Sequence, residues 1–296
     1  MKWVYLVSGA TRQAHHQSAA RQVRQLEKEV VYVRLMEQTR EIHPGMGLRT
    51  MYELLEPEGI GRDAFVALGL REGFRLKAVE RHTRTTFSVK SNRYRNLLGG
   101  IWFTGVNQLW VSDITYVYCL GRFYYLVMVM DAYSRRILGY SLADNMRAEN
   151  NLNALRMALE TRGISDYGGG LIHHSDKGGQ YVSDIYTDTL DAYGIRISMC
   201  DEVYENTHIE RVNDTIKNQY LNRIHIASQR ELMQKVAQVI NTYNNKRPHQ
   251  AIGKTTPSEY ENLLKEIPIE KRTKMEIYTQ ERAERLDPNQ LKIQFN

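Results

Sequence analysis

The sequence predicts an α/β protein with one mixed sheet, preceded by a helical N-terminal region and a basic linker. Three observations lead to this prediction. Residues 109–143 hold three apolar, strand-like runs separated by short turns. From residue 148 to about residue 244, helical and strand patterns alternate. The residues before 105 show helical spacings and many basic side chains, and the chain of 296 residues is long enough for two domains.

The chain begins with a helical pattern over residues 10–38. In it, Val23, Leu26, Val30 and Val33 recur at alternating spacings of three and four residues. This could be a short coiled-coil seam, but two heptads are too few to establish one. We therefore expect this apolar face to pack within its own domain.

Residues 46–71 are typical of two short helices joined by a turn. An apolar face runs through 48–55, proline and glycine break the pattern at 57–61, and a second helix starts at about Arg62. Glycine in such a turn fits a DNA-binding helix–turn–helix, although any helical hairpin shares the pattern. Arg62 and Arg71 are candidate contacts to DNA phosphates or bases.

The basic residues are concentrated in the first part of the chain. Residues 1–108 contain 17 Lys and Arg against 10 Asp and Glu, and the segment 71–95 is the densest. Aromatic side chains are interleaved there, which suits a DNA backbone whose counterions are released on binding. The alternative is a solvated linker that its charges keep extended. The candidate DNA contacts in this segment are Arg81, Arg84 and Arg93.

The second half of the chain has the element order of a ribonuclease-H-like fold, a mixed sheet with helices on both faces. Three strands form an antiparallel meander, and alternating helices and strands follow. The strands are expected over 109–118, 122–131, 135–143, 168–175 and 195–200, and the helices over 148–163, 179–194, about 206–223 and about 229–244.

The chain thus divides into four parts. We expect a helical region with the helix–turn–helix over 1–74 and the basic linker over 75–104. The ribonuclease-H-like core is expected over 105–262, and a charged tail over 263–296. The tail is expected to be partly disordered or to bind a partner.

Composition excludes several classes of protein. The chain is 42% hydrophobic, but no apolar run approaches the ~20 residues of a membrane span. The N-terminus turns polar after a short apolar stretch, unlike a secretory signal. Cys119 and Cys200 lie far apart without zinc-site spacing, which predicts free thiols in a reducing cytosol. We expect a cytoplasmic protein with no membrane partner.

Three acidic residues in unlike surroundings are the candidate site. Asp113 interrupts the first strand, Asp176 follows the fourth strand just before two glycines, and Glu210 lies on a helical pattern. Carboxylates are costly in a core unless they are paired or bound to metal. Three that converge would make an oxygen-rich Mg²⁺ site suited to phosphodiester chemistry with two metal ions. Without metal, their mutual repulsion predicts a disordered or partly protonated site.

Each acid also has a structural interpretation. Asp113 could be an edge acid paired with arginine, and Asp176 a turn residue that caps the next helix. Glu210 could complete a capping box with Thr207. Against that, a polar stripe that contains Glu210 runs beside the apolar face of its helix, and its members are Asn206, Glu210, Asn213 and Lys217.

A fourth acid, Asp131, ends the second strand. It is expected to pair with Arg135 or Arg136.

The motifs WVSDITY, HSDKGGQY and YENTHIERVNDTIK, followed by YNNKRPHQAIGKTTPSEY, resemble those of the integrase-core DDE transposases of bacterial insertion sequences. The resemblance is strongest to the catalytic second-frame (OrfB) protein of two-frame elements, and it runs from about Leu109 to Tyr260. The piece IHPGMGLRTMYELLEPEGIGRD resembles the helix–turn–helix that precedes the core in these proteins.

The resemblance implies roles for individual residues. Asp113, Asp176 and Glu210 match the metal-binding catalytic triad, with Mg²⁺ as cofactor and Mn²⁺ as its expected substitute. Lys217 matches a basic residue that contacts substrate DNA, and Asn206 on the same stripe is expected to contact DNA as well. The loop before Glu210 is slightly shorter than in the family, which affects its expected DNA contacts more than the triad.

The sequence therefore predicts a transposase that cuts one DNA strand at each element end and joins the freed 3′-hydroxyl to target DNA. One alternative is a ribonuclease-H-like nuclease that cuts without strand transfer; another is a non-catalytic DNA-binding remnant. The resemblance implies a homo-oligomer on paired element ends in a bacterial, nucleoid-associated setting. It also implies a first-frame DNA-binding protein as partner or fusion, because no second helix–turn–helix or leucine zipper is found here.

Overall fold

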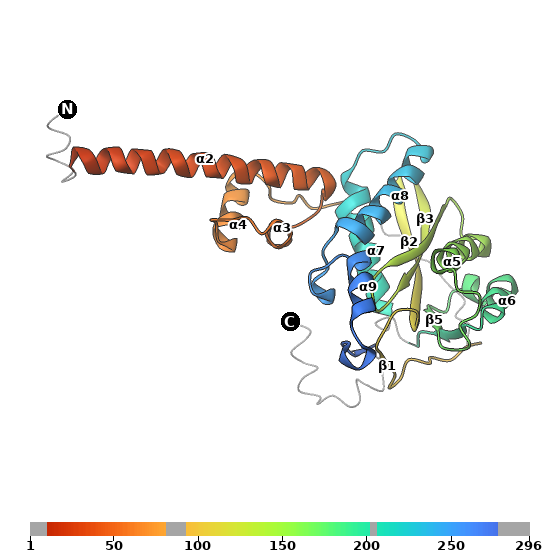
Figure 1. Cartoon of the computed structure of the whole chain (residues 1–296). Helices are drawn as coiled ribbons and strands as arrows, with labels where there is room; N and C mark the ends of the chain where they lie inside the picture. Colours follow the sequence, from red (N-terminus) through yellow and green to blue (C-terminus); the bar gives the residue numbers. More distant parts are fainter. Residues whose placement is uncertain (1–10, 81–92, 202–205, 278–296) are drawn as a thin grey trace, which may run out of the picture. The chain divides into compact units, whose positions relative to one another are not determined.

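The computed structural model describes residues 11–80, 93–201 and 206–277. The chain divides into two compact units, Met1–Ala78 and Val79–Asn296, and each is considered by itself (Figure 1). No helix within the described ranges is both long enough and apolar enough to cross a membrane.

Over residues 11–78, the N-terminal unit consists of the helices α2 (Arg12–Ile42), α3 (Leu48–Leu55) and α4 (Arg62–Arg71). The second helix of the predicted hairpin begins at Arg62 as expected. Gly69 allows α3 and α4 to approach closely, because a Cβ at this position would meet the Leu48 side chain at 2.5 Å. The small core of this unit consists of Tyr32, Met36, Met46, Leu48, Met51, Phe65 and Leu68.

Among the described residues, the apolar contacts of the long helix α2 with its unit come from its C-terminal third. Tyr32 and Met36 are buried there, whereas Val23, Leu26 and Val30 are 55%, 61% and 53% exposed. The expectation that this apolar face packs within its own domain is therefore wrong for these three residues. The buried side chains occupy another face of the helix, which the heptad spacing did not distinguish.

The second unit is built on a five-stranded sheet in the order β4-β3-β2-β5-β6. The strands β2 (Leu109–Cys119), β3 (Arg122–Asp131) and β4 (Ile137–Ala143) form the predicted antiparallel meander. The strand β5 (Ile172–Ser175) pairs parallel with β2, and β6 (Arg196–Met199) pairs parallel with β5. This order and mixed pairing are those of the predicted ribonuclease-H-like fold.

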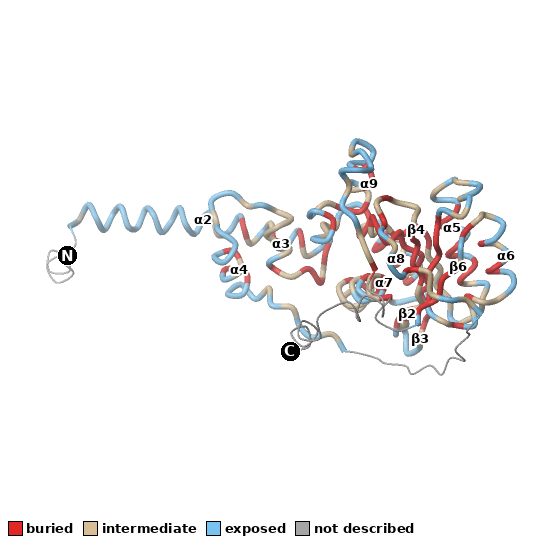
Figure 2. Tube along the Cα trace, turned by 90° about the horizontal axis from the view of Figure 1, so that it is seen from below, coloured by how far each residue is buried: buried red, intermediate tan, exposed pale blue. Residues whose placement is uncertain are grey.

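Helices cover both faces of the sheet. On each face, a hydrophobic core lies between the helices and the strands (Figure 2). One face packs against α5 (Ala148–Arg162) and α6 (Asp184–Ala192), and the other against α7 (Thr207–Asp214), α8 (Gln229–Lys246) and α9 (Pro257–Glu266). Gly139 lets α5 cross β4 closely, since a Cβ there would meet the Ala154 carbonyl oxygen at 2.1 Å. Side-chain caps start α8 at Ser228 and α9 at Thr256, the latter with a full capping box.

Two predicted helices are divided in the structure. The helix expected over 179–194 begins as the 3-10 turn η1 (Gly179–Val182), and an extended Ser183 separates this turn from α6. The helix expected over 206–223 is α7, then the π-helix η3 (Thr215–Tyr220), then the 3-10 turn η4 (Leu221–Arg223).

The structure adds two short strands outside the expected core limits. The strand β1 (Trp102–Phe103) pairs with β7 (Met275–Glu276). Two 3-10 turns, η5 (Gln250–Ile252) and η6 (Ile269–Lys271), lie between α8 and β7. Residues from the predicted linker and tail, such as Leu98, Phe103 and Ile277, are thereby buried in the core of this unit. Neither cysteine forms a disulfide bond.

Candidate active site

Two of the three acids lie where the central parallel strands meet. In the parallel pairing of β2 with β5, Ser112 is opposite Ser175. The next residues along the two strands are Asp113 and Asp176, so the strand register itself places the two acids side by side. Asp113 is half-buried, and Asp176 is exposed at the end of β5.

The third acid comes to the same place on the polar stripe of α7. The Asn213 side-chain Nδ2 donates a 2.7 Å hydrogen bond to Asp113 Oδ2, and Asn206 Nδ2 donates one of 3.3 Å to the Ser112 carbonyl oxygen. Glu210 lies between the two asparagines on the same side of the helix. The predicted polar stripe therefore faces β2 at the position of Asp113.

Glu210 does not complete the capping box that its sequence context suggested. The helix α7 begins at Thr207, its N-cap Asn206 makes no side-chain cap hydrogen bond, and Glu210 is exposed. Within the described residues, no hydrogen bond or ion pair is made by the Glu210 carboxylate. Glu210 is therefore available to a ligand.

Asp176 has the turn contact that its position before two glycines suggested. One of its carboxylate oxygens, Oδ1, accepts a 3.1 Å hydrogen bond from the Gly178 amide. The turn is also tied to β2, because the hydroxyls of Ser112 and Tyr181 are hydrogen-bonded at 3.0 Å. The other carboxylate oxygen of Asp176 can still take part in a site.

The electrostatics show that the three carboxylates interact. Burial raises the pKa of Asp113 to about 7, and the negative charges of Asp176 and Glu210 add to the rise. The hydrogen bonds from the Ile114 backbone and from Asn213 act in the opposite direction. The pKa values of Asp176 and Glu210 are also raised, in each case mainly by lost hydration. The site therefore favours partial protonation near neutral pH.

The carboxylate and amide oxygens at this site are of the chemical kind that binds a divalent cation. Three carboxylates repel one another here, and a cation would remove this penalty. The amide oxygens of Asn206 and Asn213 are also buried without a hydrogen-bond partner. In the described part of the chain, however, no three acidic, histidine or cysteine side chains are grouped closely enough to hold a metal ion as they stand.

The fourth acid has a structural role different from the predicted one. Asp131 is completely buried, and its ion-pair partner is Arg162 of α5, at 3.1 Å, rather than Arg135 or Arg136. Arg162 and Arg136 both bind Glu261 of α9, at 2.6 and 2.7 Å. The sequence did not indicate this cluster, because its members are far apart in the chain.

Two of the predicted DNA contacts, Lys217 and Arg93, are described in the second unit. Lys217 is half-buried on the π-helix η3, one turn beyond α7. Arg93 donates to the Val182 carbonyl oxygen at 3.1 Å and lies 3.4 Å from Asp184. Arg81 and Arg84 lie outside the described residues.

In the N-terminal unit, the two candidate arginines are engaged in ion pairs. Arg62 pairs with Asp63 at 3.1 Å, and Arg71 pairs with Glu29 of α2 and with Glu72. Contact of either arginine with DNA would compete with these pairs.

Asn213 is the residue at this site whose role the sequence interpretation missed. The sequence pattern indicates that Asn213 belongs to the polar stripe but does not indicate a function for it. Its position three residues after Glu210, on the same side of the helix, is the signal that could have identified it.

Comparison with known proteins gives consistent matches. Two family models, both described as integrase core domain, match residues 104–203 and 193–257. The 31 kDa protein of insertion element IS600 from Shigella sonnei is 31% identical over 242 residues, which cover 79% of this chain and 85% of that protein. The transposase for insertion sequence element IS629 from Shigella sonnei is 31% identical over 226 residues, which cover 75% of each chain.

Solved structures also match part of the chain. The HTLV-2 integrase catalytic core domain in complex with magnesium aligns with a TM-score of 0.42 and 18% identity, over 53% of this chain and 97% of that chain.

Proposed function

This chain belongs to the integrase-core transposases of bacterial insertion sequences, and from that premise we propose that Asp113, Asp176 and Glu210 are its catalytic carboxylates. The reaction assigned to them is cleavage of a DNA strand at each element end, followed by transfer of that end to target DNA. The observation that carries this proposal is the pair of asparagine hydrogen bonds that hold α7 against Ser112 and Asp113.

The proposed cofactor is Mg²⁺, with Mn²⁺ able to replace it. Carboxylate and amide oxygens are the ligands that these hard cations prefer. Asp113, Asp176 and Glu210 would hold them, and the cations would stabilise negative charge that develops on the scissile phosphate. The amide oxygens of Asn206 and Asn213 are buried without partners, and they would be satisfied by a bound cation or its water.

The protein groups position the reactants. Asn213 holds one oxygen of Asp113 at 2.7 Å and so fixes the direction of the other. In the first reaction, water attacks a phosphodiester and releases a 3′-hydroxyl. In the second, this hydroxyl attacks a target phosphodiester, forms the new 3′–5′ bond and displaces the 3′-oxygen of the target strand. Neither reaction needs a covalent enzyme nucleophile.

We infer that DNA is held mainly through its phosphates. Lys217, one turn beyond α7, and Asn206 would contact the strand next to the carboxylates. Phosphates farther along the DNA would be bound by five basic residues, Arg62, Arg71, Arg81, Arg84 and Arg93. Such contacts position DNA without specifying its sequence. Partners beyond DNA are a second copy of the chain on paired element ends and a first-frame DNA-binding protein. The proposed setting is the bacterial nucleoid.

The test is a strand-transfer assay with a labelled element-end duplex, a supercoiled target plasmid and Mg²⁺ or Mn²⁺. The assay is run in parallel with and without the first-frame protein. We expect labelled DNA to become joined to the plasmid. Nicked plasmid without joined label would instead identify a nuclease. No cleavage under either condition would contradict the catalytic assignment.

A further inference from the structure

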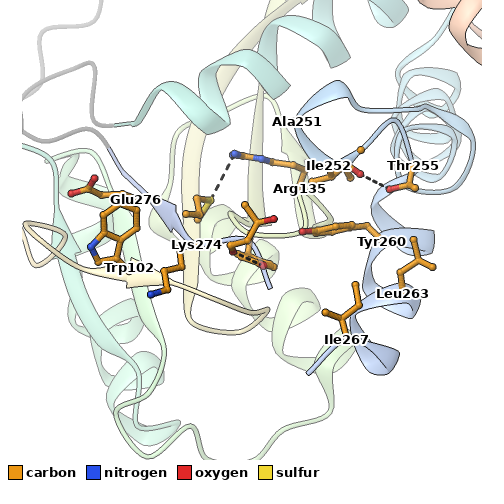
Figure 3. A pocket seen from close by; sticks show the side chains of 14 residues that line it. Trp102, Arg135, Ala251, Ile252, Thr255, Tyr260, Leu263, Ile267, Lys274 and Glu276 are labelled. Atoms are coloured by element: carbon orange, nitrogen blue, oxygen red, sulfur yellow. Dashed lines mark hydrogen bonds between the residues drawn. The ribbon is translucent and has the colours of Figure 1, made fainter. Parts of the chain in front are cut away.

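A cavity lies on the side of the second unit that carries the small sheet of β1 and β7. It has a volume of about 570 Å³ and is formed by β1, β7, the turn after β3, the segment around η5 and the helix α9 (Figure 3). None of the residues proposed above to act in catalysis lines it. The proposed function therefore leaves this cavity without a role.

A poorly satisfied cation lines the cavity. Arg135 has a left-handed backbone with φ of 65°, which is uncommon for a residue other than glycine and often marks a functional site. Its guanidinium lies 3.8 Å from the sulfur of Met275. Among the described residues, no carboxylate lies within ion-pair distance of Arg135. Burial lowers the pKa of Arg135, and the more distant charge of Asp131 offsets only part of this effect.

A second arginine, Arg247, adds positive charge near Arg135, and both of them act on His249. The Nε and Nη1 atoms of Arg247 and the Nε2 atom of His249 are buried without hydrogen-bond partners. Burial, together with the charges of Arg247 and Arg135, lowers the pKa of His249 to about 3, so this histidine is neutral. Two cationic side chains that are partly buried and incompletely hydrogen-bonded are costly, and an anion at Arg135 would reduce this cost.

The walls of the cavity supply flat aromatic surface next to that charge. Trp102 is 56% exposed at the rim. The rings of Tyr133 and Tyr260 are 6.0 Å apart and tilted by 31°. Lys274, also at the rim, is exposed and adds a second cation (Figure 3). Aromatic faces beside cationic groups are the usual means of holding an unpaired base and its phosphate.

We propose that this cavity binds an unpaired nucleotide of the DNA on which the protein acts, with its phosphate at Arg135 and Lys274 and its base against Trp102. The inference rests on the proposed function, because it takes the ligand from DNA. An unpaired nucleotide fits better than duplex DNA, since a paired base cannot present its face to an aromatic ring.

The experiment compares two DNA probes by fluorescence anisotropy with the full chain. One is a short blunt duplex, and the other is the same duplex with a short single-stranded thymidine extension. The variants are Trp102→Leu, Arg135→Gln and Lys274→Gln, with Arg156→Gln as a matched control on the exposed face of α5. Lys274 is exposed, so its replacement keeps the test valid if Arg135→Gln fails to fold.

We expect the wild type and Arg156→Gln to bind the extended probe about tenfold more tightly than the blunt one. The three cavity variants should lose this preference and keep their affinity for the blunt duplex. Equal affinity of the wild type for both probes, or a preference that the cavity variants retain, would overturn the inference while leaving the proposed function intact. Failure to bind either probe would contradict the proposed function and this inference with it.

Discussion

The side-chain amide of Asn213 holds Asp113 through a 2.7 Å hydrogen bond, and this bond joins the C-terminal end of α7 to the middle of β2. Burial raises the pKa of Asp113, and the negative charges of Asp176 and Glu210 raise it further, whereas the hydrogen bond from Asn213 lowers it. Because an amide N–H can only donate, it stabilises the ionised form of Asp113, the form that a cation binds.

Replacement of Asn213 by alanine should therefore weaken metal binding without unfolding the protein. Loss of a hydrogen bond that orients a metal ligand typically lowers metal affinity by about 10- to 100-fold. The measurement is calorimetric titration with Mn²⁺. The titration should also move to higher pH, because the bond that lowers the pKa of Asp113 is gone. Unchanged affinity at every pH would show that Asn213 only fastens the helix to the sheet.

Stability in the absence of metal should depend on pH through Asp113. Its pKa is raised from 3.8 to about 7 in the folded protein, so the folded state binds the proton more tightly than the unfolded state. The stability that this proton supplies is complete below pH 3.8, declines as the pH rises and is gone above about pH 7. Urea unfolding of the wild type and Asp113→Asn in EDTA measures this contribution.

Between pH 3.8 and about pH 7, the wild type should lose stability relative to Asp113→Asn as the pH rises. Divalent metal added at pH 8 should restore stability to the wild type alone. Parallel pH profiles for the two proteins would mean that Asp113 has an ordinary pKa.

Arg162 should matter for stability. Its side chain is 9% exposed and pairs with Asp131, which is completely buried, and with Glu261 of α9. Its replacement by methionine leaves the buried Asp131 without its cation and Glu261 with Arg136 alone, which should cost about 3–5 kcal/mol in the free energy of unfolding. Urea denaturation checks this value. Arg62→Met is the control, because its exposed pair with Asp63 should contribute less than about 1 kcal/mol.

Lys217→Ala should weaken DNA binding while leaving Mn²⁺ binding nearly unchanged. Loss of one phosphate contact should reduce the slope of log affinity against log salt by about 0.9 for duplex DNA. Anisotropy titrations over a range of salt concentrations give this slope. A variant that lost its metal site would show that Lys217 supports the carboxylates rather than the DNA.

Much of the second unit could be predicted from the sequence, because its strands are long apolar runs and its order of elements is distinctive. The strand predicted over 122–131 agrees with β3 at both ends. The short strands β1 and β7 could not be found, since two residues carry no periodicity and their pairing joins segments far apart in the chain. The break at Ser183 and the π-helix after Asp214 also escaped, because helical spacing continues through both.

The candidate site was predictable to a similar extent. The three acids stood out because each departs from its local apolar or helical pattern. The arrangement around them depends on tertiary contacts, so Asn213 at Asp113 became apparent only in the structure. Asp131 was assigned the wrong partner, because Arg162 is distant in sequence whereas Arg135 and Arg136 are close. Val23, Leu26 and Val30 are exposed because another face of α2 packs against the rest of its unit. The sequence did not indicate which face would do so.

The most direct test of the central claim is metal-dependent nicking of supercoiled plasmid by the wild type, Glu210→Gln and the control Glu160→Gln. Glu160 is an exposed residue of α5, so its replacement makes the same chemical change away from the site. If Glu210 is a catalytic metal ligand, the wild type and Glu160→Gln should nick in Mn²⁺ and stop in EDTA, and Glu210→Gln should not nick. Equal nicking by all three proteins would contradict the assignment of the site.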